Sequence, residues 1–193
     1  MANKNLLELV QDLLSETDGD EVNSINDTEE AYSAARTFQI VYESLYSTKD
    51  FPEHFELIQL AALGDTTRPT HMKIPDDVKR VVWLKYNKET ASDSDLNFVD
   101  LEYCSPTVFL ERSYSLNESD TEVEKVTDIS GIELLVKNDS FPLYWTSFDD
   151  EYVVFNSYDS DEETTVQASR SLAYVNNIPP FNLSDSFIVA IGS

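Results

Sequence analysis

Residues 18–31, DGDEVNSINDTEEA, separate two segments with helical periodicity and so decide how the N-terminal part of the chain folds. Two interpretations compete: a loop that binds calcium, or a linker whose polar residues cap the second helix. A calcium-loop template finds carboxylates at its first, third and twelfth ligand positions. It fails at the fifth position, which is Val22, and at the sixth, where Asn23 replaces the required glycine. We therefore favour the linker and expect no metal ion and no cofactor.

The segments on either side of the linker predict two helices. Leucine and valine recur at helical spacing over residues 3–16, and Gly19 follows as a stop signal. The run DTEE at residues 27–30 has the D-x-x-E pattern of a capping box, so we expect the second helix to begin at Asp27 and to run to about Thr48. Its small alanines would let another helix approach closely.

After Pro52 the apolar period changes to two, which is typical of strands. Strands are predicted in HFELIQLAAL, KRVVWLKYN and LNFVDLEYC. Hairpins are predicted from EVEKVTD with IELLVKN and from PLYWTSF with EYVVFNS. A short helix is expected over residues 106–113, with Ser105 as its N-cap, and a long strand within TTVQASRSLAYVNNI.

These patterns predict an α+β protein. An N-terminal antiparallel helix pair, part of a bundle, is expected to pack with a β-rich, antiparallel, barrel-like unit. The helical portion is assigned to residues 1–50 and the β-rich portion to residues 51–193, within one compact structural unit.

Composition limits the possible functions. The 193 residues carry a formal net charge of −24, yet 41% are hydrophobic and 11% aromatic, which is a folding composition. No basic stripe is available for phosphate contacts, so ordinary nucleic-acid binding is disfavoured. The apolar runs are too short to span a bilayer and the N-terminus lacks a signal-peptide pattern, so no membrane partner is expected.

Catalytic chemistry finds little support in the sequence. His54 and His71 lack zinc-site spacing, and Cys104, the only cysteine, is interpreted as a buried structural thiol rather than a nucleophile paired with His71. We expect no catalytic residues. Four aromatic residues on adjacent predicted strands are interpreted as a sheet core rather than a ligand-stacking face: Trp83, Tyr86, Phe98 and Tyr103.

Four phrases in order carry a resemblance to a known family. They are DEVNSINDTEEA at 20–31, DFPEHFELIQL at 50–60, RPTHMKIPDDV at 68–78 and FPLYWTSFDDEYVVFNSYDS at 141–160. Their order and spacing resemble the head-to-tail connector adaptor of short-tailed bacteriophages, the family called tail tubular protein A.

The resemblance implies a virion structural protein without enzymatic activity. Proteins of that family form a ring, usually of twelve copies, which joins the portal protein to the tail nozzle protein and lines the DNA channel. The implied location is the head-tail junction of the virion, reached from the host cytoplasm during assembly. Twelve copies at −24 each would carry −288, so DNA would pass through the lumen during ejection without specific binding.

Two sets of residues are predicted to make contacts in such a ring. The alanine-rich face of the second helix is predicted to contact the neighbouring subunit through Ala31, Ala34, Ala35, Phe38 and Tyr42. The apolar terminal stretch is predicted either to contact a partner protein or to pack on the β-rich unit of its own chain: Phe181, Phe187 and Ile188.

Two other functions stay open. The charge also fits an acidic inhibitor that mimics DNA and occupies a nucleic-acid enzyme, which would bind a basic partner with steep salt dependence. A calcium-binding protein would be revealed by a higher melting temperature in calcium.

Overall fold

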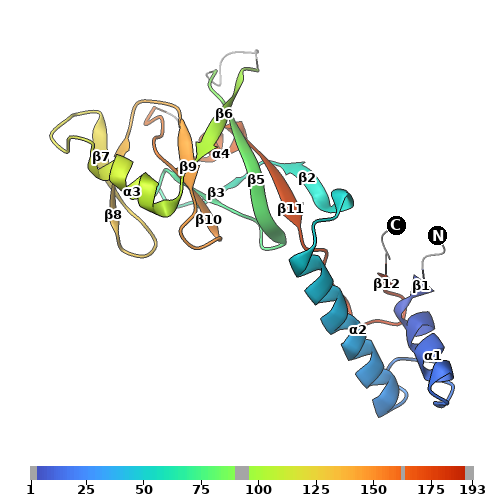
Figure 1. Cartoon of the computed structure of the whole chain (residues 1–193). Helices are drawn as coiled ribbons and strands as arrows, with labels where there is room; N and C mark the ends of the chain where they lie inside the picture. The colour runs from blue at the N-terminus through green and yellow to red at the C-terminus, as the bar shows by residue number, and fades with distance from the viewer. Residues whose placement is uncertain (1–3, 90–95, 162–163, 190–193) are drawn as a thin grey trace. The chain divides into compact units, whose positions relative to one another are not determined.

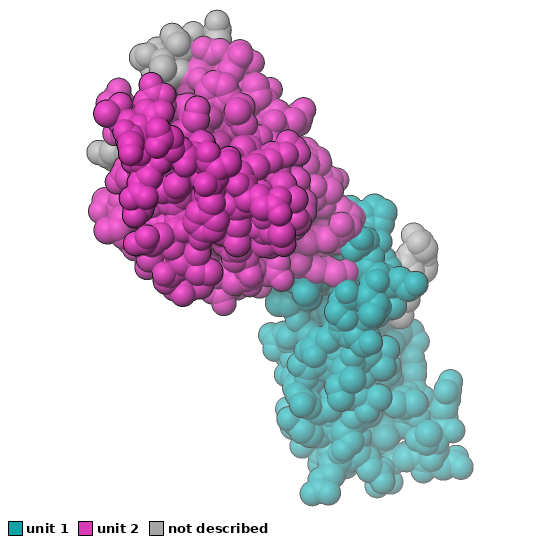
Figure 2. Space-filling model, turned by 60° about the vertical axis from the view of Figure 1, so that its left-hand side comes forward, with its two compact units in different colours: residues 1–54, 178–193 teal, residues 55–177 magenta. Residues whose placement is uncertain are grey.

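The computed structural model describes residues 4–89, 96–161 and 164–189. The chain divides into two compact units, which Figure 2 shows in separate colours. Unit 1 comprises residues 1–54 and 178–193, and unit 2 comprises residues 55–177. This division differs from the expected one, because residues 178–189 belong with the N-terminal helices rather than with the β-rich portion.

Unit 1 is built on two helices that lie side by side (Figure 1). The unit contains, in chain order, β1 (Lys4–Asn5), α1 (Leu6–Glu16), α2 (Glu29–Thr48), the 3₁₀ turn η1 (Pro52–His54) and β12 (Ile188–Val189). Strands β1 and β12 form a small antiparallel sheet that pairs Asn5 with Ile188. This pairing joins residues 188–189 to the first strand of unit 1. Next to it, the Leu6 amide donates to the carbonyl of Phe187 at 2.8 Å.

Unit 2 is a curled mixed sheet with two short helices and a separate hairpin (Figure 1). Its strands are β2 (Phe55–Ile58), β3 (Ala61–Ala62), β4 (His71–Lys73), β5 (Val78–Asn87), β6 (Phe98–Tyr103), β7 (Val123–Thr127), β8 (Glu133–Lys137), β9 (Tyr144–Thr146), β10 (Tyr152–Phe155) and β11 (Ser171–Asn177). Its helices are α3 (Pro106–Tyr114) and α4 (Thr164–Arg170). Together with unit 1, this confirms the predicted α+β class with a barrel-like sheet.

The large sheet has the strand order β2-β11-β5-β6-β9-β10-β4-β3. All neighbours are antiparallel except β6 and β9, which run parallel. The two edge strands, β2 and β3, are separated by only two residues of chain, so the sheet curls until its edges come together. The Leu60 amide at this junction donates to the hydroxyl of Ser171 on β11 at 3.3 Å.

The inner face of the curled sheet holds the main core of unit 2. Alternation along the strands brings Leu84 and Tyr86 of β5, Ala173 and Val175 of β11, and Phe155 of β10 into one buried cluster. A second cluster around Phe109 packs α3 against the β7–β8 hairpin and buries Cys104.

Several local predictions are confirmed. Helix α3 has Ser105 as its N-cap and Pro106 at its first turn, and both predicted hairpins form as β7–β8 and β9–β10. The segment predicted as one long strand instead forms α4 followed by β11. Ala168 of α4 joins the sheet core, and this tertiary packing overrides the local strand propensity.

The predicted capping box at the start of α2 is wrong. Helix α2 begins at Glu29, and its N-cap is Thr28, whose hydroxyl accepts the Ala31 amide at 3.1 Å. The Asp27 carboxylate closes the preceding turn instead, where it accepts the amides of Asn23 and Ser24. A capping box does occur at the start of α1, between Asn5 and Glu8.

Candidate interaction surface

The linker between α1 and α2 is a packed turn. Val22 and Ile25 are buried in the core of unit 1. Asp185 lies in residues 178–189, the segment that returns to unit 1. Its carboxylate accepts the Ile25 amide at 2.8 Å and so joins that segment to the linker. Among the described residues, no group of three or more His, Cys, Asp or Glu side chains is arranged to hold a metal ion.

The alanine-rich face of α2 packs inside its own chain. Ala31, Ala34 and Ala35 are buried together with Leu6, Val10 and Leu14 of α1. The small side chains allow the close helix approach that the sequence predicts, but the helix that approaches is α1 of the same chain. In this conformation the three alanines are therefore not available to a neighbouring subunit.

The other predicted contact residues form an aromatic cluster in unit 1. Phe38 packs against the alanine core, and the Tyr42 ring contacts Phe181 and Phe187 with centroids 5.1 and 6.0 Å apart. Phe181 and Phe187 thus cover their own helical unit and not the β-rich unit. Ile188 is 59% exposed and remains at the surface.

Part of the accessible apolar surface of α2 lies beside the alanine-rich face. Val41 is 59% exposed and Leu45 is 45% exposed, although both are large aliphatic residues on a helix of a highly acidic chain. They line a groove of about 510 Å³ within unit 1. The other lining residues are Leu9, Phe38, Tyr42, Tyr46, Lys49, Asp50, Phe51 and Val189.

The groove is electrically neutral along its aromatic wall. The rings of Tyr42 and Tyr46 lie 4.3 Å apart, centroid to centroid. Burial, together with the neighbouring Tyr46, raises the pKa of Tyr42 to about 12, so its hydroxyl stays protonated at physiological pH. The charged side chains on the lining, Lys49 and Asp50, have opposite signs. The groove can therefore receive an apolar surface without burying a net charge.

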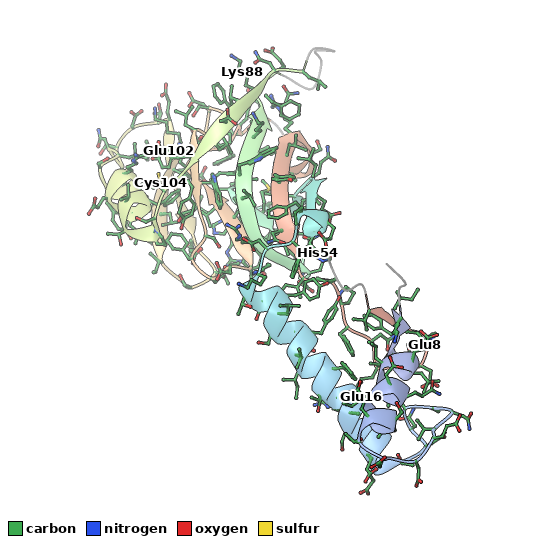
Figure 3. All side chains as sticks on the ribbon, turned by 45° about the vertical axis from the view of Figure 1, so that its right-hand side comes forward. Glu8, Glu16, His54, Lys88, Glu102 and Cys104 are labelled. Carbon is green, nitrogen blue, oxygen red and sulfur yellow. The ribbon has the colours of Figure 1, made fainter. Side chains whose placement is uncertain are left out.

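The histidines and the cysteine have structural surroundings. His54 lies in η1, beyond the end of α2 (Figure 3). Its ring packs edge-on against the ring of Tyr46. His71 is buried and contacts Asp128 through Nε2 at 2.9 Å and the Thr70 hydroxyl through Nδ1 at 3.2 Å. The structure thus pairs His71 with Asp128 rather than with Cys104. Burial raises the pKa of the Cys104 thiol, which weakens it as a nucleophile.

The aromatic strand residues divide between the two faces of the sheet. Tyr86 belongs to the core, as predicted. Trp83 instead lies in a stacked row with Tyr174 and Phe55 on the outer face, with ring centroids 5.4–5.5 Å apart. Phe98 and Tyr103 are exposed.

No protein-family model matches the chain, and no curated protein matches it. In the part of the chain that the structure describes, no helix is both long and apolar enough to cross a membrane.

The sequence did not reveal which part of α2 is exposed, because the apolar stripe of α2 is wide. Val41 and Leu45 recur with Phe38 and Tyr42 at helical spacing, and periodicity does not say which side of such a stripe the rest of the chain covers.

Proposed function

We propose that this chain is a structural adaptor of a short-tailed phage virion, which assembles as a ring between the portal protein and the tail nozzle protein. The observation that carries the proposal is the neutral apolar groove on α2 in a chain of net charge −24. An exposed apolar patch on so acidic a chain points to a contact with another protein. The resemblance of the four sequence phrases to the connector family supplies the identity of the assembly.

The groove replaces the alanine-rich face as the proposed subunit contact. A ring needs a heterologous contact, in which one patch of a subunit binds a different patch of the next. The groove supplies one of these patches, and we propose that an apolar surface of the adjacent copy occupies it. The acidic surface then has the role expected for a channel, because carboxylates repel the phosphates of passing DNA.

The test is negative-stain imaging of the purified chain mixed with the portal protein encoded with it. Rings capping the portal are expected for the wild-type chain. Val41→Glu should abolish them, because a carboxylate would be buried in an apolar contact without a partner. The matched control is Leu143→Glu, since Leu143 is 58% exposed but lies in unit 2, outside the groove. Bare portals with folded wild-type protein, across a range of salt concentrations, would refute the adaptor.

A further inference from the structure

Helix α2 has three faces, and one of them is both exposed and uncharged. The first face packs on α1 and is buried. The second is charged, and its side chains bond along the helix: Arg36 donates to Gln39 at 2.8 Å, and Gln39 donates to Glu43 at 2.7 Å. The third face, which we call the α2 strip, consists of Ser33, Thr37, Ile40, Val41, Ser44, Leu45 and Thr48. These residues recur at spacings of three and four, so they lie side by side along about 22 Å of helix.

The α2 strip is accessible and can be covered by apolar atoms. Each of its residues is exposed and uncharged, and Ile40 is 61% exposed. The threonine hydroxyls of the strip are used within the helix. Thr37 donates to the Ser33 carbonyl at 2.9 Å, and Thr48 donates to the Ser44 carbonyl at 2.9 Å. A partner could therefore cover these residues without leaving the threonine donors unpaired.

The order of residues along the strip is symmetric about the midpoint between Ile40 and Val41. Outside these two aliphatic residues, positions at equal distances from the midpoint hold small hydroxyl residues: Thr37 with Ser44, and Ser33 with Thr48. Leu45 alone lacks a counterpart in the strip, because the matching position is Arg36 on the charged face. Two identical helices that pair antiparallel about a two-fold axis bring together residues at equal distances from that axis. Small residues would then lie opposite small ones, which lets the helices approach closely, with aliphatic residues in contact at the centre.

The charge of the chain indicates that a second copy, rather than a basic protein, covers the strip. A basic partner is attracted by carboxylates, and the strip offers none. Two copies at −24 each repel one another, so they can approach closely only through a surface that lacks acidic residues. The same two-fold arrangement places Arg36 of one copy and Glu43 of the other on the same side, offset by about two residues, or roughly 3 Å. Both Arg36–Glu43 contacts would then be attractive.

We propose that two copies of the chain associate through the α2 strip, with their α2 helices antiparallel about a two-fold axis between Ile40 and Val41. A contact about 22 Å long and one helix wide is smaller than a standard interface of roughly 1,600 Å², so the association is weak. Because Val41 and Leu45 also line the groove, the dimer partly covers the groove and separates before another surface fills it. The proposal concerns α2 alone and does not rest on the adaptor function.

The first test is sedimentation equilibrium of the purified chain at about 0.1 M and 1 M salt. We expect a monomer–dimer equilibrium that shifts towards the dimer at the higher salt concentration, because the repulsion between copies is screened. Ile40→Glu should weaken the dimer about tenfold or more, since it places two carboxylates at the centre of the contact. Ile40 is largely exposed, so this change should leave the fold intact, which circular dichroism checks.

The matched control for Ile40→Glu is Leu57→Glu. Leu57 lies on β2 in unit 2 and is 56% exposed, so the change adds the same charge at a similarly accessible position away from α2. Leu57→Glu should leave the monomer–dimer equilibrium close to that of the wild type. A loss of the dimer in both variants would show that added charge alone weakens it, and would overturn the role of the strip.

Engineered cysteines test the antiparallel arrangement. Oxidation of a chain with both Thr37→Cys and Ser44→Cys should give a covalent dimer, because each new thiol faces the other position in the second copy. Thr37→Cys alone should stay uncross-linked, since its two copies would lie about 10 Å apart along the helices, beyond the roughly 7 Å between Cα atoms that a disulfide spans. Cys104 is buried and should not contribute.

The proposal is overturned if the chain stays monomeric at both salt concentrations, or if Ile40→Glu associates as strongly as the wild type. It is also overturned if the double cysteine variant gives no covalent dimer. Cross-linking of Thr37→Cys alone would show that the helices pair in parallel instead. Covalent species larger than a dimer would show a heterologous contact in place of the two-fold one.

Discussion

The buried pair of His71 and Asp128 determines how the stability of the protein changes with pH. The direction of that change shows whether His71 is neutral or charged in the folded state. His71 Nε2 lies 2.9 Å from an Asp128 oxygen, and Asp128 also accepts the Ser130 amide and hydroxyl. Burial lowers the pKa of His71 below its ordinary 6.5, although Asp128 and Asp149 act in the opposite direction and Arg68 adds to the lowering. We therefore expect His71 to be neutral in the folded state at pH 7.

A lowered pKa of His71 makes stability fall on acidification. The unfolded chain takes up a proton near pH 6.5, while the folded chain does not until its own lower pKa is reached. The contribution is thus fully present above pH 6.5 and is lost as the pH falls towards the folded pKa. One proton corresponds to at most about 1.4 kcal/mol of unfolding free energy per pH unit. Between pH 7.5 and 5.5 the loss is therefore at most about 1.4 kcal/mol, which corresponds to a decrease of no more than roughly 3–6 °C in Tm.

The assay is thermal or urea unfolding of the wild type and of His71→Gln across this pH range. The 37 acidic residues contribute equally to the pH dependence of unfolding free energy in both proteins. The difference between the two stability curves therefore isolates the contribution of His71. The wild type should lose stability relative to the variant as the pH falls. If the wild type instead gained relative stability below pH 6.5, His71 would be taking up a proton to form an ion pair with Asp128. That result would refute the argument that desolvation dominates.

Three further changes test the packing and the caps. Ala35→Leu should cost about 1–3 kcal/mol of unfolding free energy in urea, because Ala35 is fully buried between α1 and α2; an unchanged midpoint would contradict this packing. Ser105→Ala should cost about 1 kcal/mol by losing the N-cap of α3, and Ser105→Asp should retain most of it. Asp185→Ala should cost about 1–3 kcal/mol in thermal melts, because the Ile25 amide loses its acceptor, while Asp185→Asn should cost less.

The sequence was most informative where structure is decided locally. Ser105 followed by Pro106 is a strong helix-start signal, and α3 begins there. The capping box of α2 failed for a local reason as well: Thr28 and Asp27 are both good N-cap residues, and their competition is decided by the turn that Asp27 closes at Asn23.

Long-range pairing was beyond the reach of periodicity. Strand β11 lies between β2 and β5, although more than 80 residues separate it from either in sequence. The parallel pairing of β6 with β9 depends on where α3 and the β7–β8 hairpin return the chain, and alternation contains no such information. The return of residues 178–189 to the helices was missed for the same reason.

The candidate surface shows the corresponding limit for function. The sequence identified the apolar stripe of α2 but not its division into a face covered by α1 and a face lining the groove. Burial of Ala35 and exposure of Val41 depend on the partner helix, which covers only part of the stripe. A contact surface can therefore be read from sequence only after the intramolecular partners of each face are known.

Salt dependence separates the adaptor from the acidic DNA mimic. The net negative charge opposes the association of adaptor copies, whereas it favours the binding of a DNA mimic to a basic partner. Copies that meet through the neutral groove must approach against the mutual repulsion of −24 per chain. Added salt shortens the Debye length from about 10 Å at 0.1 M to 3 Å at 1 M and weakens this repulsion, while burial of apolar surface is retained. Ring assembly should therefore strengthen with salt. A DNA mimic is attracted to its basic partner by that charge, so its binding should weaken steeply over the same range.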